Sequence, residues 1–184
     1  MHRNRATSLA ALVASGCVAM AACGGSDGNS QASTLAAALQ LQHQGQLAAA
    51  KQLYQHVIAA QPSNYVAHYD LGVIAQQQGD DSTALAEYGA ALTAHPNYVP
   101  ALYNQATIYQ RTDPATAIDI YRRIIALQPH APSAYFNLGL LETRSGSVQR
   151  GIQDLAQAVS QQSDLLGRVP KRFRTVVATV TGSS

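Results

Sequence analysis

The side chains best suited to recognition chemistry recur at a regular spacing along this chain. One series is aromatic, a second carries amide or carboxylate groups, and a third runs from polar to cationic: Tyr69, Tyr103 and Phe136; Asp70, Asn104 and Asn137; Gln77, Arg111 and Arg144. An asparagine amide offers a donor and an acceptor, as a peptide backbone requires, and a guanidinium can bind a carboxylate through two parallel hydrogen bonds. Together these groups favour an extended peptide as the ligand.

Residue patterns for catalysis are weak by comparison. The six histidines are scattered, and the chain carries no HExxH, GxSxG or phosphate-loop motif. No cysteine follows Cys23, so the rest of the chain offers no thiol as a nucleophile, zinc ligand or disulfide partner. Glu142 stands where an apolar residue is expected, and we expect it to pair with a nearby arginine. We therefore expect a protein that is not an enzyme and that binds no metal or cofactor.

The amino terminus has the layout of a secretory signal peptide. A positive patch, MHRNR, precedes an uncharged and mainly apolar run over residues 6–23, which is short for a membrane-spanning helix of about 20 apolar residues. We expect cleavage to remove residues 1–22. Loss of Arg3 and Arg5 from the twelve basic residues leaves ten, against ten acidic residues, and this balance argues against nucleic acid as the main partner.

The stretch MAAC, which ends at Cys23, resembles the lipobox of bacterial lipoproteins, although its first residue is methionine instead of the usual leucine, valine or isoleucine. The resemblance implies that Cys23 receives a diacylglycerol and becomes the first residue of an exported protein anchored to a membrane of the cell envelope. Cys17 is a rival site, and release into solution after ordinary cleavage is the alternative to anchoring. Residues 23–33 are small and polar, which predicts a flexible tether.

The remainder of the chain repeats one pattern about every 34 residues, a period typical of stacked helical repeats. Three copies read AHYDLGVIAQQQGDDSTALAEYGAALTAHP, ALYNQATIYQRTDPATAIDIYRRIIALQP and AYFNLGLLETRSGSVQRGIQDLAQAVS, and a fainter copy precedes them. Abundant alanine and glutamine favour helix. The sequence therefore predicts an all-α array of four helix-turn-helix units over residues 34–163, the first of them degenerate.

Glycines and tyrosines mark fixed positions in each unit. Three glycines fall where a first helix stops, a place that favours the left-handed cap conformation: Gly45, Gly79 and Gly146. Gly72 and Gly139 lie inside first helices, where they allow the two helices of a unit to pack closely. We expect three tyrosines of the second helices to fill the space between neighbouring units: Tyr54, Tyr88 and Tyr121.

These units resemble the tetratricopeptide repeat over roughly residues 31–163. The resemblance implies a right-handed curved solenoid whose first helices line a concave groove. Matched position by position, it places ten of the most informative side chains in that groove: Tyr69, Asp70, Gln77, Tyr103, Asn104, Thr107, Arg111, Phe136, Asn137 and Arg144. The alternative is that Tyr103 and Phe136 only pack between helices and that the two asparagines only bridge neighbouring helices.

Residues 164–184 follow the last unit without repeating its pattern. Phe173, Val177 and Val180 recur at helical spacing after Pro170, which predicts a capping helix over residues 170–180. A strand is the alternative, because residues 175–181 are rich in β-branched side chains. This segment also holds a basic patch. We interpret the patch as a solvated face of the cap, and the alternative is a binding site for anionic lipid or a partner.

The export signal, the tether and the repeats together predict a non-enzymatic envelope adaptor that binds a peptide or protein partner in the groove. The alternative is a structural subunit of a secretion, pilus or outer-membrane assembly, held through its outer faces and the capping helix. The sequence leaves the oligomeric state open.

Overall fold

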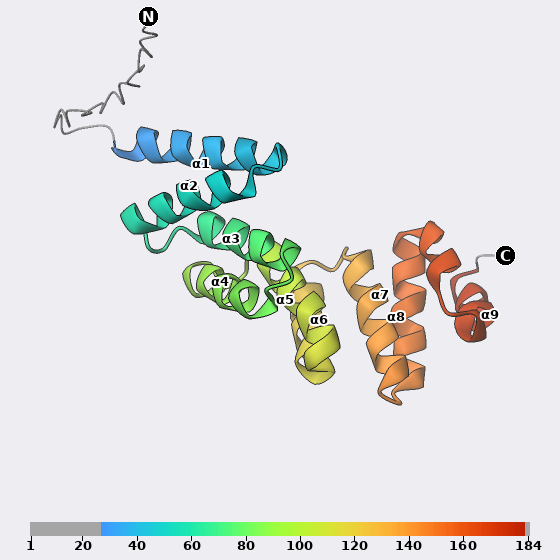
Figure 1. The fold of residues 1–184 in the computed structure, drawn as a ribbon. Helices are drawn as coiled ribbons and strands as arrows, with labels where there is room; N and C mark the ends of the chain where they lie inside the picture. The colour runs from blue at the N-terminus through green and yellow to red at the C-terminus, as the bar shows by residue number, and fades with distance from the viewer. Residues whose placement is uncertain (1–26, 183–184) are drawn as a thin grey trace, which may run out of the picture.

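The computed structural model describes residues 27–182, and this part of the chain is almost entirely helical, without strands. Eight α-helices form four consecutive pairs, which we number as units one to four: α1 (Asp27–His43) and α2 (Leu47–Ala60); α3 (Tyr65–Gln77) and α4 (Asp81–Ala94); α5 (Val99–Thr112) and α6 (Pro114–Leu127); α7 (Pro132–Arg144) and α8 (Val148–Gln161). A short 3-10 helix, η1 (Ser163–Arg168), leads to the last helix, α9 (Lys171–Thr181). Figure 1 shows the units stacked in chain order into an elongated, curved array, as the sequence predicts.

The first helix begins earlier than expected. Residues 27–33 were predicted to belong to the flexible tether but form the start of α1. Adding a residue to an existing helix is cheap compared with nucleating one, and the hydroxyls of Ser33 and Thr34 both donate hydrogen bonds to the Ser30 carbonyl, at 2.7 and 2.8 Å. The predicted signal peptide and the lipidation site Cys23 lie outside the described residues.

The turns inside the units follow the predicted glycine pattern. Gly45, Gly79 and Gly146 have φ angles of 74°, 78° and 91°, the left-handed region that glycine adopts without strain. Unit three makes its turn without a glycine. Asp113 ends α5 and caps α6, because its carboxylate accepts a hydrogen bond from the backbone N–H of Thr116 at 3.3 Å.

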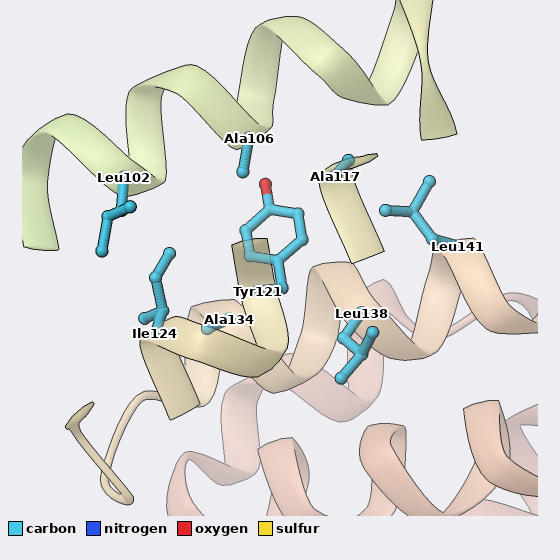
Figure 2. Packing of buried hydrophobic residues seen from close by; sticks show 8 residues of the cluster. All are labelled: Leu102, Ala106, Ala117, Tyr121, Ile124, Ala134, Leu138 and Leu141. Atoms are coloured by element: carbon cyan, nitrogen blue, oxygen red, sulfur yellow. The ribbon is translucent and has the colours of Figure 1, made fainter. Parts of the chain in front are cut away.

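The tyrosines of the second helices fill the core between units, as predicted. Tyr54, Tyr88 and Tyr121 are fully buried. Figure 2 shows Tyr121 of α6 with Ala106 of α5 on one side and Leu138 of α7 on the other, so one ring joins two units.

Unit four is packed differently. Leu155 takes the place of the tyrosine, and glycines face each other across the helix pair: a Cβ added to Gly139 would lie 2.7 Å from the carbonyl oxygen of Gly151 and 2.9 Å from the backbone nitrogen of Leu155. In unit two, by contrast, a Cβ added to Gly72 would meet the ring of Tyr88, at 2.6 Å. The backbones of α7 and α8 therefore approach each other directly.

The carboxyl-terminal segment caps the array with a helix, α9, which excludes the strand alternative for residues 175–181. Leu165 of η1, Val169 between η1 and α9, and Val177 of α9 are buried against Leu155 and Val159 of α8. These contacts cover the apolar side of the last unit, which has no following unit to cover it. No helix among the described residues is both long enough and apolar enough to cross a bilayer.

Candidate protein-binding groove

The first helices of the units carry the ten predicted groove residues, and these side chains differ in accessibility. Three are exposed, at the carboxyl ends of their helices: Gln77, Arg111 and Arg144. Five are half-buried: Tyr69, Tyr103, Asn104, Thr107 and Asn137. Asp70 and Phe136 are buried, with 6% and 4% of their surface exposed.

The two asparagines bridge neighbouring units through their amide nitrogens. Nδ2 of Asn104 donates to the hydroxyl of Tyr88 at 3.2 Å and lies 3.5 Å from that of Tyr69. Nδ2 of Asn137 makes the equivalent contacts one unit later, at 3.3 Å to Tyr121 and 2.8 Å to Tyr103. The bridging alternative is therefore confirmed for the nitrogens, whereas Oδ1 of each asparagine accepts no hydrogen bond from any residue that the structure describes.

Three glutamines continue these contacts into the preceding helix of the same unit. Tyr54 donates to Oε1 of Gln42, and Tyr88 donates to Oε1 of Gln76, both at 2.7 Å, while Nε2 of Gln110 donates to the Tyr121 hydroxyl. Sequence reasoning missed these glutamines, although Gln42, Gln76 and Gln110 recur at the repeat period. We call the resulting series of asparagine, tyrosine and glutamine contacts the hydroxyl ladder.

Asp70 occupies the asparagine position of unit two but cannot donate a hydrogen bond while ionised. Its Oδ2 is buried and has no hydrogen-bond partner among the described residues. Burial raises the pKa of Asp70 from 3.8 to about 6, and the Tyr54 hydroxyl and His43 offset only part of that rise. A carboxyl group at this position thus links neighbouring units less well than the asparagine amides of the hydroxyl ladder do.

The aromatic series does not form one open surface. Tyr69 packs edge-on against Tyr98, with ring centroids 5.2 Å apart, and Tyr103 packs against Tyr121 at 5.8 Å. Phe136 is covered by the carboxyl-terminal segment, and the Arg168 guanidinium lies 5.0 Å from its ring centroid. The prediction that Phe136 lines an accessible groove is therefore wrong, because η1 and α9 lie outside the repeat pattern from which it was made.

The charged and polar ends of the first helices remain at the surface. Nη2 of Arg111 lies 2.6 Å from Oδ2 of Asp81, in an ion pair in which the Arg111 side chain is 58% exposed and the Asp81 side chain 36%. Arg144 borders a hollow of about 270 Å³ together with Gln110 and Pro114. The accessible part of the predicted groove therefore consists of the asparagine oxygens, the half-buried tyrosines and these polar ends.

The expectation for Glu142 is confirmed, because Nη2 of Arg122 lies 2.7 Å from its Oε1. Within residues 27–182, no group of histidine and carboxylate side chains is arranged to hold a metal ion.

Comparisons with known proteins agree with this architecture. Two tetratricopeptide repeat models match, at residues 41–107 and 101–164. The Photosystem I assembly protein Ycf3 of Prochlorococcus marinus strain MIT 9211 is 35% identical over 103 residues, which are 53% of this chain and 60% of Ycf3. Its counterpart from Synechococcus sp. strain CC9605 is 32% identical over 105 residues, 54% of this chain and 61% of the relative. The match thus spans less than two thirds of these relatives.

Solved structures share the fold at low sequence identity. The MamA protein superposes with a TM-score of 0.71 at 20% identity and covers 85% of both chains. A tetratricopeptide repeat protein from Parabacteroides merdae reaches 0.64 at 19% identity, over 84% of this chain and 75% of its own. With two repeat models matching nearly the whole array of helical pairs, the chain belongs to the tetratricopeptide repeat family.

Proposed function

We propose that this chain is a lipid-anchored adaptor of the bacterial cell envelope that binds an extended segment of a partner protein along its first helices. Tetratricopeptide repeats mediate protein–protein interaction, so a protein partner follows from the family. The observation that carries the finer proposal is the state of Asn104 and Asn137: tyrosine hydroxyls hold each Nδ2, and each Oδ1 accepts no hydrogen bond from a residue within 27–182. Two acceptors fixed in this way, one unit apart, suit two separate N–H groups of one extended peptide backbone.

An assembly role is consistent with the relatives. The Ycf3 proteins are named for the assembly of photosystem I, and we propose that this chain likewise holds a partner protein during assembly, without catalysis. Nucleic acid is not proposed as a partner, because the predicted mature chain is neutral. The alternative function, a structural subunit of an envelope complex, requires contact through the outer faces and α9, where Val176 and Val180 are exposed.

Crosslinking capture from native membranes tests the groove, with partners identified by mass spectrometry. The Asn104→Ala, Asn137→Ala double variant is expected to lose the partners that the unaltered chain captures. Tyr54→Phe is the matched control, because it breaks the Tyr54–Gln42 contact of the hydroxyl ladder and leaves in place both asparagines and the tyrosine hydroxyls that hold them. Partners retained by the double variant but lost from a Val176→Ser, Val180→Ser variant would support the structural subunit instead.

The lipid anchor is tested by the intact mass of the protein extracted from membranes. We expect loss of residues 1–22 and a gain of diacylglycerol on Cys23. Cys23→Ser is expected to prevent lipid attachment, and Cys17→Ser is the control that leaves it unchanged. An unchanged mass in Cys23→Ser would contradict the anchor without affecting the groove.

A further inference from the structure

A second candidate site lies away from the groove, in a cleft where α6, α7 and α8 meet. The cleft has a volume of about 430 Å³. Ile125, Tyr135 and Leu138 provide apolar wall, and Glu142 and Asp154 contribute two carboxyl groups. The combination of an apolar wall and carboxyl groups is the environment that the long side chains of lysine and arginine occupy, with the stem on the wall and the charge at the polar end.

Glu142 gives this cleft a buried and incompletely satisfied acceptor. Only 3% of the residue is exposed. Its Oε1 accepts a hydrogen bond from Arg122, but its Oε2 is buried and receives no hydrogen bond from any residue in the described range. A buried carboxylate oxygen without a donor is costly, so the cleft favours a ligand that brings a donor.

Asp154 lies beside Glu142, whose carboxyl group disfavours ionisation of Asp154. Burial and the neighbouring Glu142 raise the pKa of Asp154 to about 7, and Arg122 lowers it only in part. In the absence of a ligand, a proton on Asp154 is therefore the available donor to Glu142 near neutral pH.

The cationic side chains around the cleft do not donate a hydrogen bond to Oε2 of Glu142. Arg122 on α6 is shared between Glu142 and Asp119, whose Oδ1 lies 3.6 Å from its Nη1. Arg150 on α8 borders the cleft, but its side chain is exposed and forms no ion pair with a described residue. The carboxyl groups of Glu142 and Asp154 thus share one guanidinium, that of Arg122, which also pairs with Asp119.

The equivalent positions elsewhere in the array lack these features. Two units earlier, Ala75 stands in place of Glu142, Glu87 pairs with His68 at 2.7 Å, and the hollow measures about 130 Å³. In unit three, Tyr109 stands at the position that corresponds to Glu142. Among the units that the structure describes, the paired carboxyl groups are therefore a feature of unit four alone.

From this geometry we propose that the cleft binds a basic side chain, arginine or lysine, of a partner protein. The cationic group replaces the proton on Asp154 and donates to Oε2 of Glu142, and its aliphatic stem packs on Ile125, Tyr135 and Leu138. The released proton passes to solvent, so binding strengthens as pH rises. This site is independent of the groove and of the lipid anchor.

The test is an NMR titration of the isotope-labelled full chain, purified in detergent, with blocked glycine pentapeptides that carry one central arginine or lysine. The same peptide with citrulline, a neutral shape analogue of arginine, is the ligand control. We expect shifts at Glu142, Gln153 and Asp154 for the basic peptides only. The affinity is expected to rise about tenfold between pH values of about 6 and about 8, because a competing proton with a pKa near 7 is removed.

Variants separate this site from general effects on folding. Glu142→Gln and Asp154→Asn are each expected to weaken binding about tenfold or more, and Asp154→Asn also removes the pH dependence while it retains a folded spectrum. Glu87→Gln, at the corresponding place two units earlier, is expected to leave binding unchanged. Equal binding of the citrulline peptide, or full affinity in Asp154→Asn, overturns the proposal. Binding seen only in Arg150→Gln also overturns it, because Arg150 would then be the occupant.

Discussion

Units two and four have the same helix-turn-helix form, but their helices are held together by different means. In unit two, Gly72 makes room for the ring of Tyr88, and the Tyr88 hydroxyl contacts Gln76 within the unit and Asn104 in the next. In unit four, Gly139 and Gly151 bring the backbones together, and Leu155 offers no hydroxyl. The tyrosine thus does two tasks, filling the core and linking units, and leucine does only the first.

The difference follows from the position of each unit in the array. Unit two has a neighbour on each side, so a polar group at the tip of its buried ring can reach a partner. Unit four is followed by η1 and α9, whose buried side chains here are apolar, including Leu165 and Val177. A hydroxyl facing that cap would be buried without a partner, at a cost in stability.

The largest expected effect is that of Gly139→Ala, which tests the close backbone approach in unit four. The new Cβ meets backbone atoms of Gly151 and Leu155, which move only if the helices separate. We expect the free energy of unfolding to fall by about 3 kcal/mol, measured by denaturant unfolding followed by circular dichroism. Gly89→Ala in α4 is the control: its Cβ meets nothing within 4 Å, and we expect a gain of about 0.5–1 kcal/mol. Similar behaviour of both variants would refute the close approach.

Tyr88→Phe removes the hydroxyl that links neighbouring units and leaves the packing of the ring in place. The half-buried side chains of Gln76 and Asn104 lose a hydrogen-bond partner, and we expect a loss of about 1–2 kcal/mol in unfolding free energy. Tyr109→Phe is the matched control, because the Tyr109 ring is half-buried and no described residue contacts its hydroxyl by a hydrogen bond; we expect a change below about 0.5 kcal/mol. Equal losses in the two variants would show that the hydroxyl ladder adds nothing to stability.

Asp70→Asn is expected to replace the buried carboxylate of unit two with an amide that can donate a hydrogen bond. The resulting gain in unfolding free energy depends on pH. The folded-state pKa of Asp70, about 6, exceeds its ordinary 3.8, so the folded chain binds this proton more tightly than the unfolded chain does. Stability is therefore lost as pH rises from about 4 through about 6. We expect Asp70→Asn to raise the unfolding free energy by about 1–2 kcal/mol at a pH of about 8, and by less at about 4.

Urea unfolding at both pH values measures the Asp70→Asn effect, and Asn104→Asp is the reciprocal variant. It places a carboxyl one unit further along and is expected to destabilise the chain more at the higher pH. A pH-independent gain from Asp70→Asn would show that the ionised carboxylate is not the cause.

Arg111→Gln has the smallest expected effect and tests whether surface charges also link the units. Arg111 of unit three pairs with Asp81 of unit two, but both side chains are solvated. We expect the unfolding free energy to change by less than about 0.5 kcal/mol, again by denaturant unfolding. A loss as large as that of Tyr88→Phe would mean that the ion pair, and not the buried ladder, couples these units.

Sequence alone predicted the features that recur in most of the repeats. Left-handed caps such as Gly79 recur because glycine adopts this conformation without strain, and buried rings such as Tyr88 recur because they fill the space between neighbouring units. Gln76 was missed because a glutamine on a helix resembles a surface residue until a buried hydroxyl is known to face it. Asp70 was treated as equivalent to Asn104, because the two side chains share a shape, although an ionised carboxylate cannot donate a hydrogen bond and costs more to bury.

The groove could be predicted only in outline. The covering of Phe136 depends on Arg168 and on the cap, a segment without the repeat period. Similarly, the start of α1 depends on helix propagation through residues that composition assigns to a tether. Segments outside the repeat pattern therefore determine which of the repeated positions remain accessible to a ligand.

The buried tyrosines also give the chain an optical property. It contains nine tyrosines and no tryptophan, so phenol groups dominate its near-ultraviolet absorption. Burial raises the pKa of Tyr88 to about 12 and also raises the pKa of Tyr121. In alkaline solution such an inner phenol ionises readily only after its own interface between units has opened. The absorbance of tyrosinate therefore reports how many junctions between units have separated, without any added label.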